Sequence, residues 1–151
     1  MLKFILEFVL SFLSTVAFGV ITDIPQKTMT AAGIAGASGW VVYYYFKDIF
    51  SSQAFGNFLG SIAIGLLCII FSRKLKYPTI IFNIPALVPL VPGGPSYQMI
   101  RSLVSGDNEA TFNYLVKVIV TAGAIAAGFM VTSLVEKKVI QKRRPLPYKN
   151  V

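Results

Sequence analysis

The sequence contains no histidine and only one cysteine among its 151 residues. Histidine is the commonest metal ligand and a frequent general base, so its absence removes the usual centre of many catalytic and metal sites. The single cysteine, Cys68, excludes a disulfide within the chain. Charged residues are also scarce, at 13% of the chain, whereas an average soluble domain carries about 25%. We therefore expect no metal, no cofactor and no enzyme activity.

Apolar residues, in contrast, are abundant and lie in long blocks. They make up 55% of the chain, and the mean hydropathy is +0.69. A helix of about 20 apolar residues crosses the hydrocarbon core of a bilayer. Five blocks suit such spans, namely Phe4–Ile21, Met29–Phe46, Ala54–Phe71, Pro78–Val104 and Phe112–Val135. We predict an all-α polytopic membrane protein with about five transmembrane helices in residues 1–135, followed by a basic tail, residues 136–151.

The net charge of +8 does not indicate nucleic acid, because the basic residues lie at the edges of the apolar blocks. Basic clusters in this position set membrane topology and contact anionic lipid. If the fourth block crosses fully, one side carries Lys27, Arg73, Lys74, Lys76, Lys137, Lys138, Lys142, Arg143, Arg144 and Lys149. The opposite side carries Lys3 and Lys47. We predict an inner or plasma membrane location, with the N-terminus outside and the C-terminus in the cytoplasm.

Small residues recur at helical spacing on several predicted spans. Gly56 and Gly60 form a GxxxG pair in the third span, and Gly123 and Gly128 lie in the fifth. Small residues let two helix backbones approach closely in a membrane. We therefore interpret these four glycines as helix-packing positions.

Polar residues on the same spans leave two interpretations open. Asn113 and Lys117 are poor choices for a dry helix interface, so they either line a solute path or reach the membrane surface. Arg101 lies near the outer end of the fourth span, where it could bind a solute carboxylate or pair with Asp107 or Glu109. Glu7 lies one turn from Lys3, so we expect its side chain to reach the membrane surface. No carboxylate lies at the middle of a predicted span, which leaves the chain without an evident proton carrier.

The most unusual stretch is residues 84–97, which holds four of the eight prolines and a Gly-Gly pair within an apolar run. Proline in a helix interior costs about 3 kcal/mol or more. A membrane helix tolerates a break only where the freed backbone groups are buried in protein or line a wet cavity. Transporters commonly build substrate sites at such breaks. We predict that the fourth span is broken at Pro92-Gly93-Gly94.

The second half-helix is expected to begin at Pro95, which suits the first helical position. Gly94 would then precede the helix, and the amides of Ser96, Tyr97 and Gln98 would be free at the positive end of its dipole. Such a helix terminus binds anions. A solute carboxylate fits this geometry, and a structural kink without a solute is the alternative.

The pattern Pro89-x-x-Pro92-Gly93-x-x-x-Tyr97, inside a hydrophobic span that follows a short basic loop, resembles the threonine/serine exporter family. More specifically, the chain resembles the small subunit, which corresponds to the C-terminal half of the single-chain exporters. Gly94, Pro95 and Ser96 occupy variable positions of this motif. The resemblance implies a larger, separately encoded subunit as partner, and export of small amino acids or dicarboxylates.

We therefore predict a subunit of a two-component exporter for threonine, serine or small carboxylates that works by alternating access. Its partners would be the larger subunit, membrane lipid and a small-molecule substrate but no nucleic acid, and self-association into a homo-oligomer stays open. The candidate substrate-binding residues are Pro92, Gly93, Gly94, Ser96, Tyr97, Arg101, Asn113 and Lys117. The alternative is a non-transporting scaffold or regulatory subunit of another membrane protein. An intramembrane enzyme is disfavoured, because the chain offers neither a midplane carboxylate pair nor a convincing serine–lysine dyad.

Overall fold

The computed structural model describes residues 2–141, which form six α-helices and one short 3₁₀ helix without any strand. The elements are α1 (Leu2–Ile21), α2 (Gln26–Ile49), α3 (Gln53–Leu75), α4 (Thr79–Leu87), η1 (Val88–Leu90), α5 (Gly93–Val104) and α6 (Asn108–Gln141). The prediction of an all-α fold is confirmed. Residues 136–141, at the start of the predicted tail, continue α6. The remaining tail residues, 142–151, lie outside the described part of the chain.

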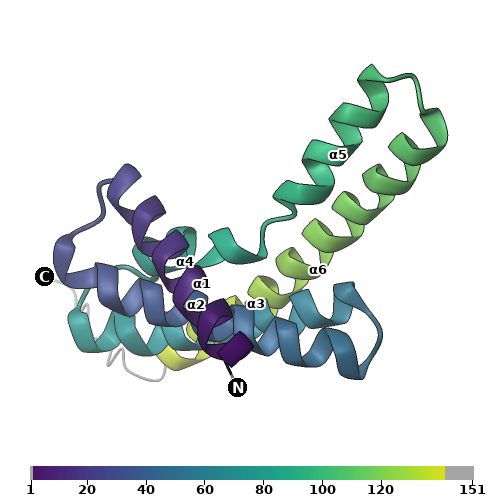
Figure 1. Cartoon of the computed structure of the whole chain (residues 1–151). Coiled ribbons are helices and arrows are strands. Elements are labelled where there is room, and N and C mark those ends of the chain that lie inside the picture. Colours follow the sequence, from purple (N-terminus) through teal and green to yellow (C-terminus); the bar gives the residue numbers. More distant parts are fainter. Residues whose placement is uncertain (1, 142–151) are drawn as a thin grey trace, which may run out of the picture.

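The lengths of the helices fit a membrane protein with about five spans. By length and apolar composition, α1, α3 and α6 could each cross a bilayer, and α4 with α5 adds a fourth span if the bent pair crosses as one. The remaining predicted span is α2, which is 24 residues long. It packs against α1, α3 and α4, in the middle of the bundle (Figure 1). Because its neighbours cover it, α2 does not need the strongly apolar surface of a lipid-facing helix.

Helices α1 to α4, η1 and the later part of α6, from Thr121 onward, form the body of the protein, which is built around the small residues of α2. A Cβ atom placed on Gly36 would lie 3.1 Å from the carbonyl oxygen of Ala86 in α4. One placed on Gly39 would lie 3.0 Å from the carbonyl oxygen of Gly60 in α3. Such short distances require glycine, and they bring the helix backbones together. The core contains Ala31, Ala32, Ala35, Ile64, Cys68, Phe82, Ala86 and Leu90, with Ile125 from α6.

The remaining part of the chain is a helical hairpin that projects away from the body (Figure 1). We call α5 and the first part of α6, residues 93–120, the outer hairpin. Helix α5 has no buried residue and packs mainly against α6, whereas the later part of α6 packs against α3 from the buried Thr121 onward. At the tip, Gly106 adopts a left-handed φ of 78°, and the Asp107 carboxylate accepts a hydrogen bond of 2.9 Å from the backbone N–H of Ala110.

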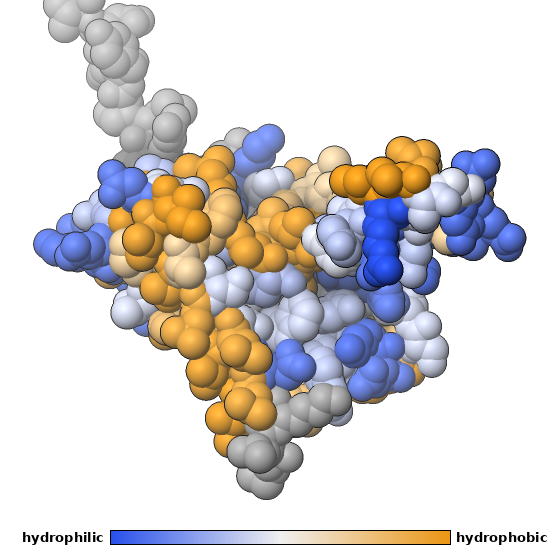
Figure 2. Space-filling view, turned by 45° about the horizontal axis from the view of Figure 1, so that its top comes forward, coloured by the Kyte–Doolittle hydropathy of each residue, from blue (hydrophilic) through white to orange (hydrophobic). Residues whose placement is uncertain are grey.

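Large hydrophobic side chains are exposed over much of the surface, especially on α1, α5 and α6. Figure 2 shows hydrophobic residues in a band along α1 and on one side of the outer hairpin, with hydrophilic residues at the hairpin tip. Only 17% of the apolar window of α1 is buried inside the protein, and 22% of that of α6. Exposed apolar helix faces of this extent suit contact with lipid or with another membrane protein.

Candidate functional site

The predicted break in the fourth span is confirmed, and it begins slightly earlier than expected. The axis bends by 54° between the α4–η1 segment and α5, with Val91 and Pro92 as the residues between them. Helix α5 starts at Gly93 rather than at Pro95. The reason is that the first backbone N–H groups of any helix lack partners, so proline is tolerated at the third helical position as well as at the first.

This shift changes which amides are free at the start of α5. The Ser96 N–H donates to the Pro92 carbonyl oxygen at 3.0 Å, and the Ser96 hydroxyl donates to the same oxygen at 2.7 Å. The Gly93 N–H donates to the Val91 carbonyl oxygen at 2.8 Å. The expectation of a free Ser96 amide is therefore wrong, and Tyr97, one turn into the helix, has the Gly93 carbonyl as its helical partner. The amide left to face a ligand belongs to Gly94.

The break is open to its surroundings. A Cβ atom placed on Gly93 or Gly94 would meet no atom within 4 Å. Tyr97, one turn along α5, is 65% exposed, and Arg101, one turn further, is also exposed. Space therefore exists for a solute or a partner chain beside the start of α5.

The other candidate residues lie on the outer hairpin too. Asn113 and Lys117 are exposed on α6, and the Lys117 ammonium lies 5.3 Å from the centre of the Tyr114 ring. The structure thus places Arg101, Asn113 and Lys117 on the same hairpin as Tyr97, away from the core of the body. Asp107, suggested as a partner of Arg101, caps α6 instead.

The four candidate packing glycines occupy different surroundings. Gly56 and Gly60 face α2, where a Cβ atom on Gly60 would lie 2.8 Å from the Gly39 carbonyl oxygen. Gly128 faces α3, and a Cβ atom there would lie 2.7 Å from the Phe58 carbonyl oxygen. Gly123, earlier on α6, would meet nothing within 4 Å. Three of the four glycines therefore lie in helix seams, and Gly123 faces open space.

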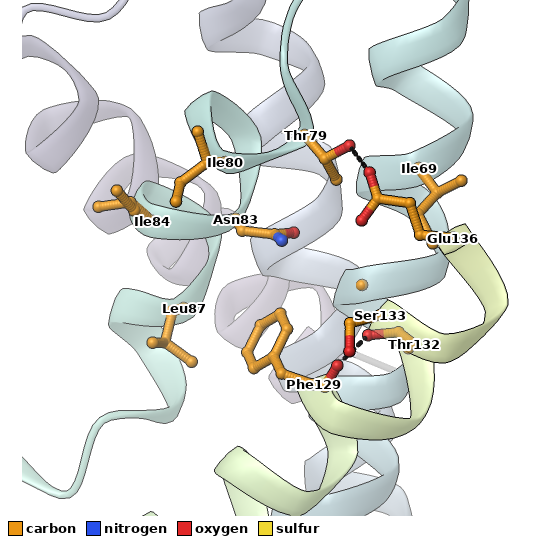
Figure 3. Close-up of a pocket in the computed structure, with 11 residues that line it drawn as sticks. Ile69, Thr79, Ile80, Asn83, Ile84, Leu87, Phe129, Thr132, Ser133 and Glu136 are labelled. Carbon is orange, nitrogen blue, oxygen red and sulfur yellow. Dashed lines mark hydrogen bonds between the residues drawn. The ribbon is translucent and has the colours of Figure 1, made fainter. Parts of the chain in front are cut away.

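A cavity with several polar side chains, which the sequence did not predict, lies between α3, α4 and α6 (Figure 3). It encloses about 280 Å³ and is lined by Gly65, Ile69, Thr79, Ile80, Asn83, Ile84, Leu87, Phe129, Thr132, Ser133 and Glu136. The Thr79 hydroxyl donates a hydrogen bond to the Glu136 carboxylate. The Asn83 side chain points into the cavity, and its carbonyl oxygen is buried without a hydrogen-bond partner.

Two sequence signals could have found this cavity. Glu136 follows Thr132 by four residues, so it continues the polar face of α6 by one more turn, although the predicted basic tail begins at this residue. Asn83 is the sole amide side chain between residues 78 and 91. Neither signal alone predicts a site, because Asn83 and Glu136 are brought together only when α6 lies beside α4.

Glu7 also has a different environment from the one expected. Its carboxylate accepts a hydrogen bond of 2.7 Å from the indole N–H of Trp40 in α2. The two side chains line a smaller groove of about 190 Å³ together with Ser11, Ser14 and Pro89. The carboxylate is therefore held between two helices rather than directed only toward the membrane surface.

Comparison with known proteins identifies the family. A sequence profile described as Threonine/Serine exporter, ThrE, matches residues 7–135. The chain belongs to the threonine/serine exporter family. It is also 26% identical, over 143 aligned residues, to an uncharacterized protein of Haemophilus influenzae, an alignment that covers 89% of this chain and 48% of that protein. No solved structure is significantly similar to the chain.

Membership of the exporter family, together with the apolar helices, indicates a membrane protein. The family profile extends from α1 to α6, so it includes the break between α4 and α5 and nearly all of the cavity lining. The chain spans about half the length of the curated relative that it matches.

Proposed function

We propose that this chain is one subunit of a two-component exporter of small amino acids, and that it works by alternating access with a larger subunit. The observation that carries the proposal is the exporter-family match over a chain whose fourth span is broken. Broken helices near the bilayer midplane are where transporters gather free backbone groups and helix dipoles around a solute.

The outer hairpin supports the need for a second subunit. It carries Arg101, Asn113 and Lys117 among exposed apolar residues. A charged side chain facing lipid costs several kilocalories per mole unless it reaches the interface or meets a polar partner. A partner that covers the hairpin would remove this cost.

The start of α5 is our proposed site for the solute carboxylate. The Gly94 amide lies at the positive end of the α5 dipole, where negative charge is stabilised. Tyr97 adds a hydroxyl donor, and Arg101 adds a positive charge one turn further along the same face. Pro92 and Gly93 form the bend that opens this position, while Ser96 holds the bend through its hydrogen bonds to Pro92.

The arrangement of basic residues supports an orientation with the C-terminus in the cytoplasm. Lys27 at the start of α2, Arg73 to Lys76 at the end of α3, and Lys137 and Lys138 near the end of α6 lie at the same end of the bundle (Figure 1). The connections after α2 and α5 lie toward the other end. Basic residues concentrate on the cytoplasmic side of a membrane protein.

The proposal is tested by efflux of labelled serine, threonine and succinate from cells that lack their own exporters. The chain is expressed alone, with its larger subunit, and not at all. We expect efflux only when both subunits are present. A stable complex of the two subunits without efflux of any of the three solutes would contradict the proposal and favour the scaffold alternative.

Two substitutions test the site at the break. Gly93→Leu adds a side chain where a Cβ atom meets nothing, so we expect normal membrane insertion but loss of efflux because the solute position is filled. Tyr97→Ala removes an exposed side chain and is expected to reduce efflux strongly. Val104→Ala, which shortens an exposed side chain near the end of α5, is the matched control. Normal efflux by both variants at wild-type protein levels would exclude this site.

A further inference from the structure

The cavity between α3, α4 and α6 has a chemical character that export alone does not explain. Glu136 supplies one negative charge, and the lining contains no lysine or arginine. The rest of the wall is mostly apolar, with Ile69, Leu87 and Phe129 as its larger members. A pocket with a few convergent polar groups on apolar walls is the usual form of a small-molecule site.

Each of the three hydroxyl groups in the cavity already donates its hydrogen atom to a hydrogen bond within the protein. Thr79 donates to Glu136, Thr132 donates to the Phe129 carbonyl oxygen at 3.0 Å, and Ser133 donates to the Met130 carbonyl oxygen at 2.8 Å. Their oxygen atoms can still accept hydrogen bonds. With the Asn83 carbonyl oxygen and the Glu136 carboxylate, the acceptors of the cavity outnumber its remaining donor group, the NH2 of Asn83.

We propose that this cavity binds the ammonium group of a small amine-bearing solute, with Glu136 as its counter-ion and the Asn83 carbonyl oxygen as a second acceptor. An ammonium group offers only donors, which matches the excess of acceptors. Its charge-assisted hydrogen bond to a carboxylate is stronger than a neutral one. The volume of about 280 Å³ lies just below the usual range for drug-sized ligands, so it suits a small amino acid.

A purely structural role for Glu136 accounts for fewer features of the cavity than an ammonium site does. Its carboxylate accepts from Thr79 at the start of α4, where it also faces the positive end of that helix, and this contact joins α6 to α4. That role does not explain why the Asn83 carbonyl oxygen is buried without a partner. Buried polar atoms are nearly always hydrogen-bonded, so this oxygen is available to accept a hydrogen bond from a ligand or from a water molecule.

The transport role of this cavity rests on the proposed function. The cavity lies near the basic end of the bundle, close to Lys137 and to the connection that follows Arg73. If that end faces the cytoplasm, the cavity is where an exporter would first receive its solute. A carboxylate in a lining that contains no lysine or arginine would also repel dicarboxylates, which narrows the solute class to amines.

A binding measurement tests the site independently of export. The full chain in phosphatidylcholine–phosphatidylglycerol nanodiscs is titrated with labelled L-threonine, with unlabelled ethanolamine and succinate as competitors. We expect ethanolamine, an amine without a carboxylate, to displace threonine, and succinate to leave it bound. Repeating the titration with phosphatidylethanolamine in the nanodiscs shows whether a lipid ammonium group competes for the same position.

Glu136→Gln is the decisive variant, because the amide keeps an acceptor for the Thr79 hydroxyl while removing the charge. We expect threonine to bind about tenfold more weakly or worse, the usual cost of losing a charged hydrogen-bond partner. Glu109→Gln, which removes an exposed carboxylate from the first turn of the same helix, is the matched control and should bind normally. Asn83→Leu, which replaces the amide with apolar atoms of similar size, should also weaken binding.

Three results would overturn the site: no amine binding by the wild-type chain, displacement of threonine by succinate as readily as by ethanolamine, or wild-type affinity in Glu136→Gln. Failure of the export function is a separate result. If binding follows the expected pattern while cells with both subunits show no efflux, the ammonium site stands and the exporter proposal fails.

Discussion

The body and the outer hairpin solve the problem of packing helices in opposite ways. In the body, glycine and alanine bring α2 within backbone contact distance of α3 and α4. In the outer hairpin, α5 has no buried residue at all, and large side chains such as Val104 are up to 83% exposed. The body is closed by contacts within the chain, whereas the outer hairpin is left for lipid or a partner to cover.

The ionisable groups show the same difference. Glu7 and Glu136, which lie where helices of the body meet their neighbours, each accept a hydrogen bond from another helix. Arg101 and Lys117, on the outer hairpin, are exposed. Since an uncompensated charge at membrane depth is costly, the hairpin charges are the ones that we expect to act on something outside this chain.

The largest effect should come from enlarging a glycine in a seam of the body. Gly128→Leu would force a side chain against the Phe58 carbonyl oxygen, 2.7 Å from the new Cβ atom, and against the Ser61 side chain. Overpacking of this kind typically costs 1–3 kcal/mol, and sometimes more, and backbone atoms cannot rotate away. We expect about 3 kcal/mol of destabilisation, measured as a lower thermal midpoint in detergent.

Gly123→Leu is the matched control for that prediction, because the same change on the same helix meets no atom within 4 Å. We expect the isolated chain to keep its thermal midpoint. If Gly123→Leu destabilised the isolated chain as much as Gly128→Leu, the distinction between seam and open face would be lost. If Gly123→Leu disturbed only the complex with the larger subunit, the open face would be assigned to the partner.

An intermediate effect is expected at the contact between α1 and α2. Trp40→Phe keeps a smaller aromatic ring at this position but removes the N–H that donates to Glu7 at 2.7 Å. A hydrogen bond to a charged group contributes about 1.5–3 kcal/mol to the free energy of unfolding. Because Glu7 is partly exposed and water can replace the lost donor, we expect the variant to lose only about 1 kcal/mol of that free energy. Glu7→Gln in the Trp40→Phe background should restore part of the thermal midpoint, because a neutral amide costs less to leave unpaired. An unchanged midpoint in Trp40→Phe would show that the bond contributes nothing.

The sequence was informative where a local pattern has a local consequence. The apolar blocks located the helices to within a few residues, and the prolines located the break. The start of α5 was misjudged because Pro95 is acceptable at either the first or the third helical position. The cavity escaped notice because Thr79, Asn83 and Glu136 come from two helices that are far apart in sequence, and only tertiary packing brings them together.

The smallest effect on stability is expected on the outer hairpin, and it is the one that bears most directly on function. Lys117→Ala removes an exposed side chain whose charge lies 5.3 Å from the centre of the Tyr114 ring. The free energy of unfolding of the isolated chain, followed through its thermal midpoint, should therefore change by no more than about 0.5 kcal/mol. Arg101→Ala should behave alike. If the hairpin faces the larger subunit or the solute, both variants should nevertheless lose efflux or co-purification with that subunit. Wild-type efflux and co-purification in both would mean that lipid alone covers the outer hairpin, and that its charges simply reach the membrane surface.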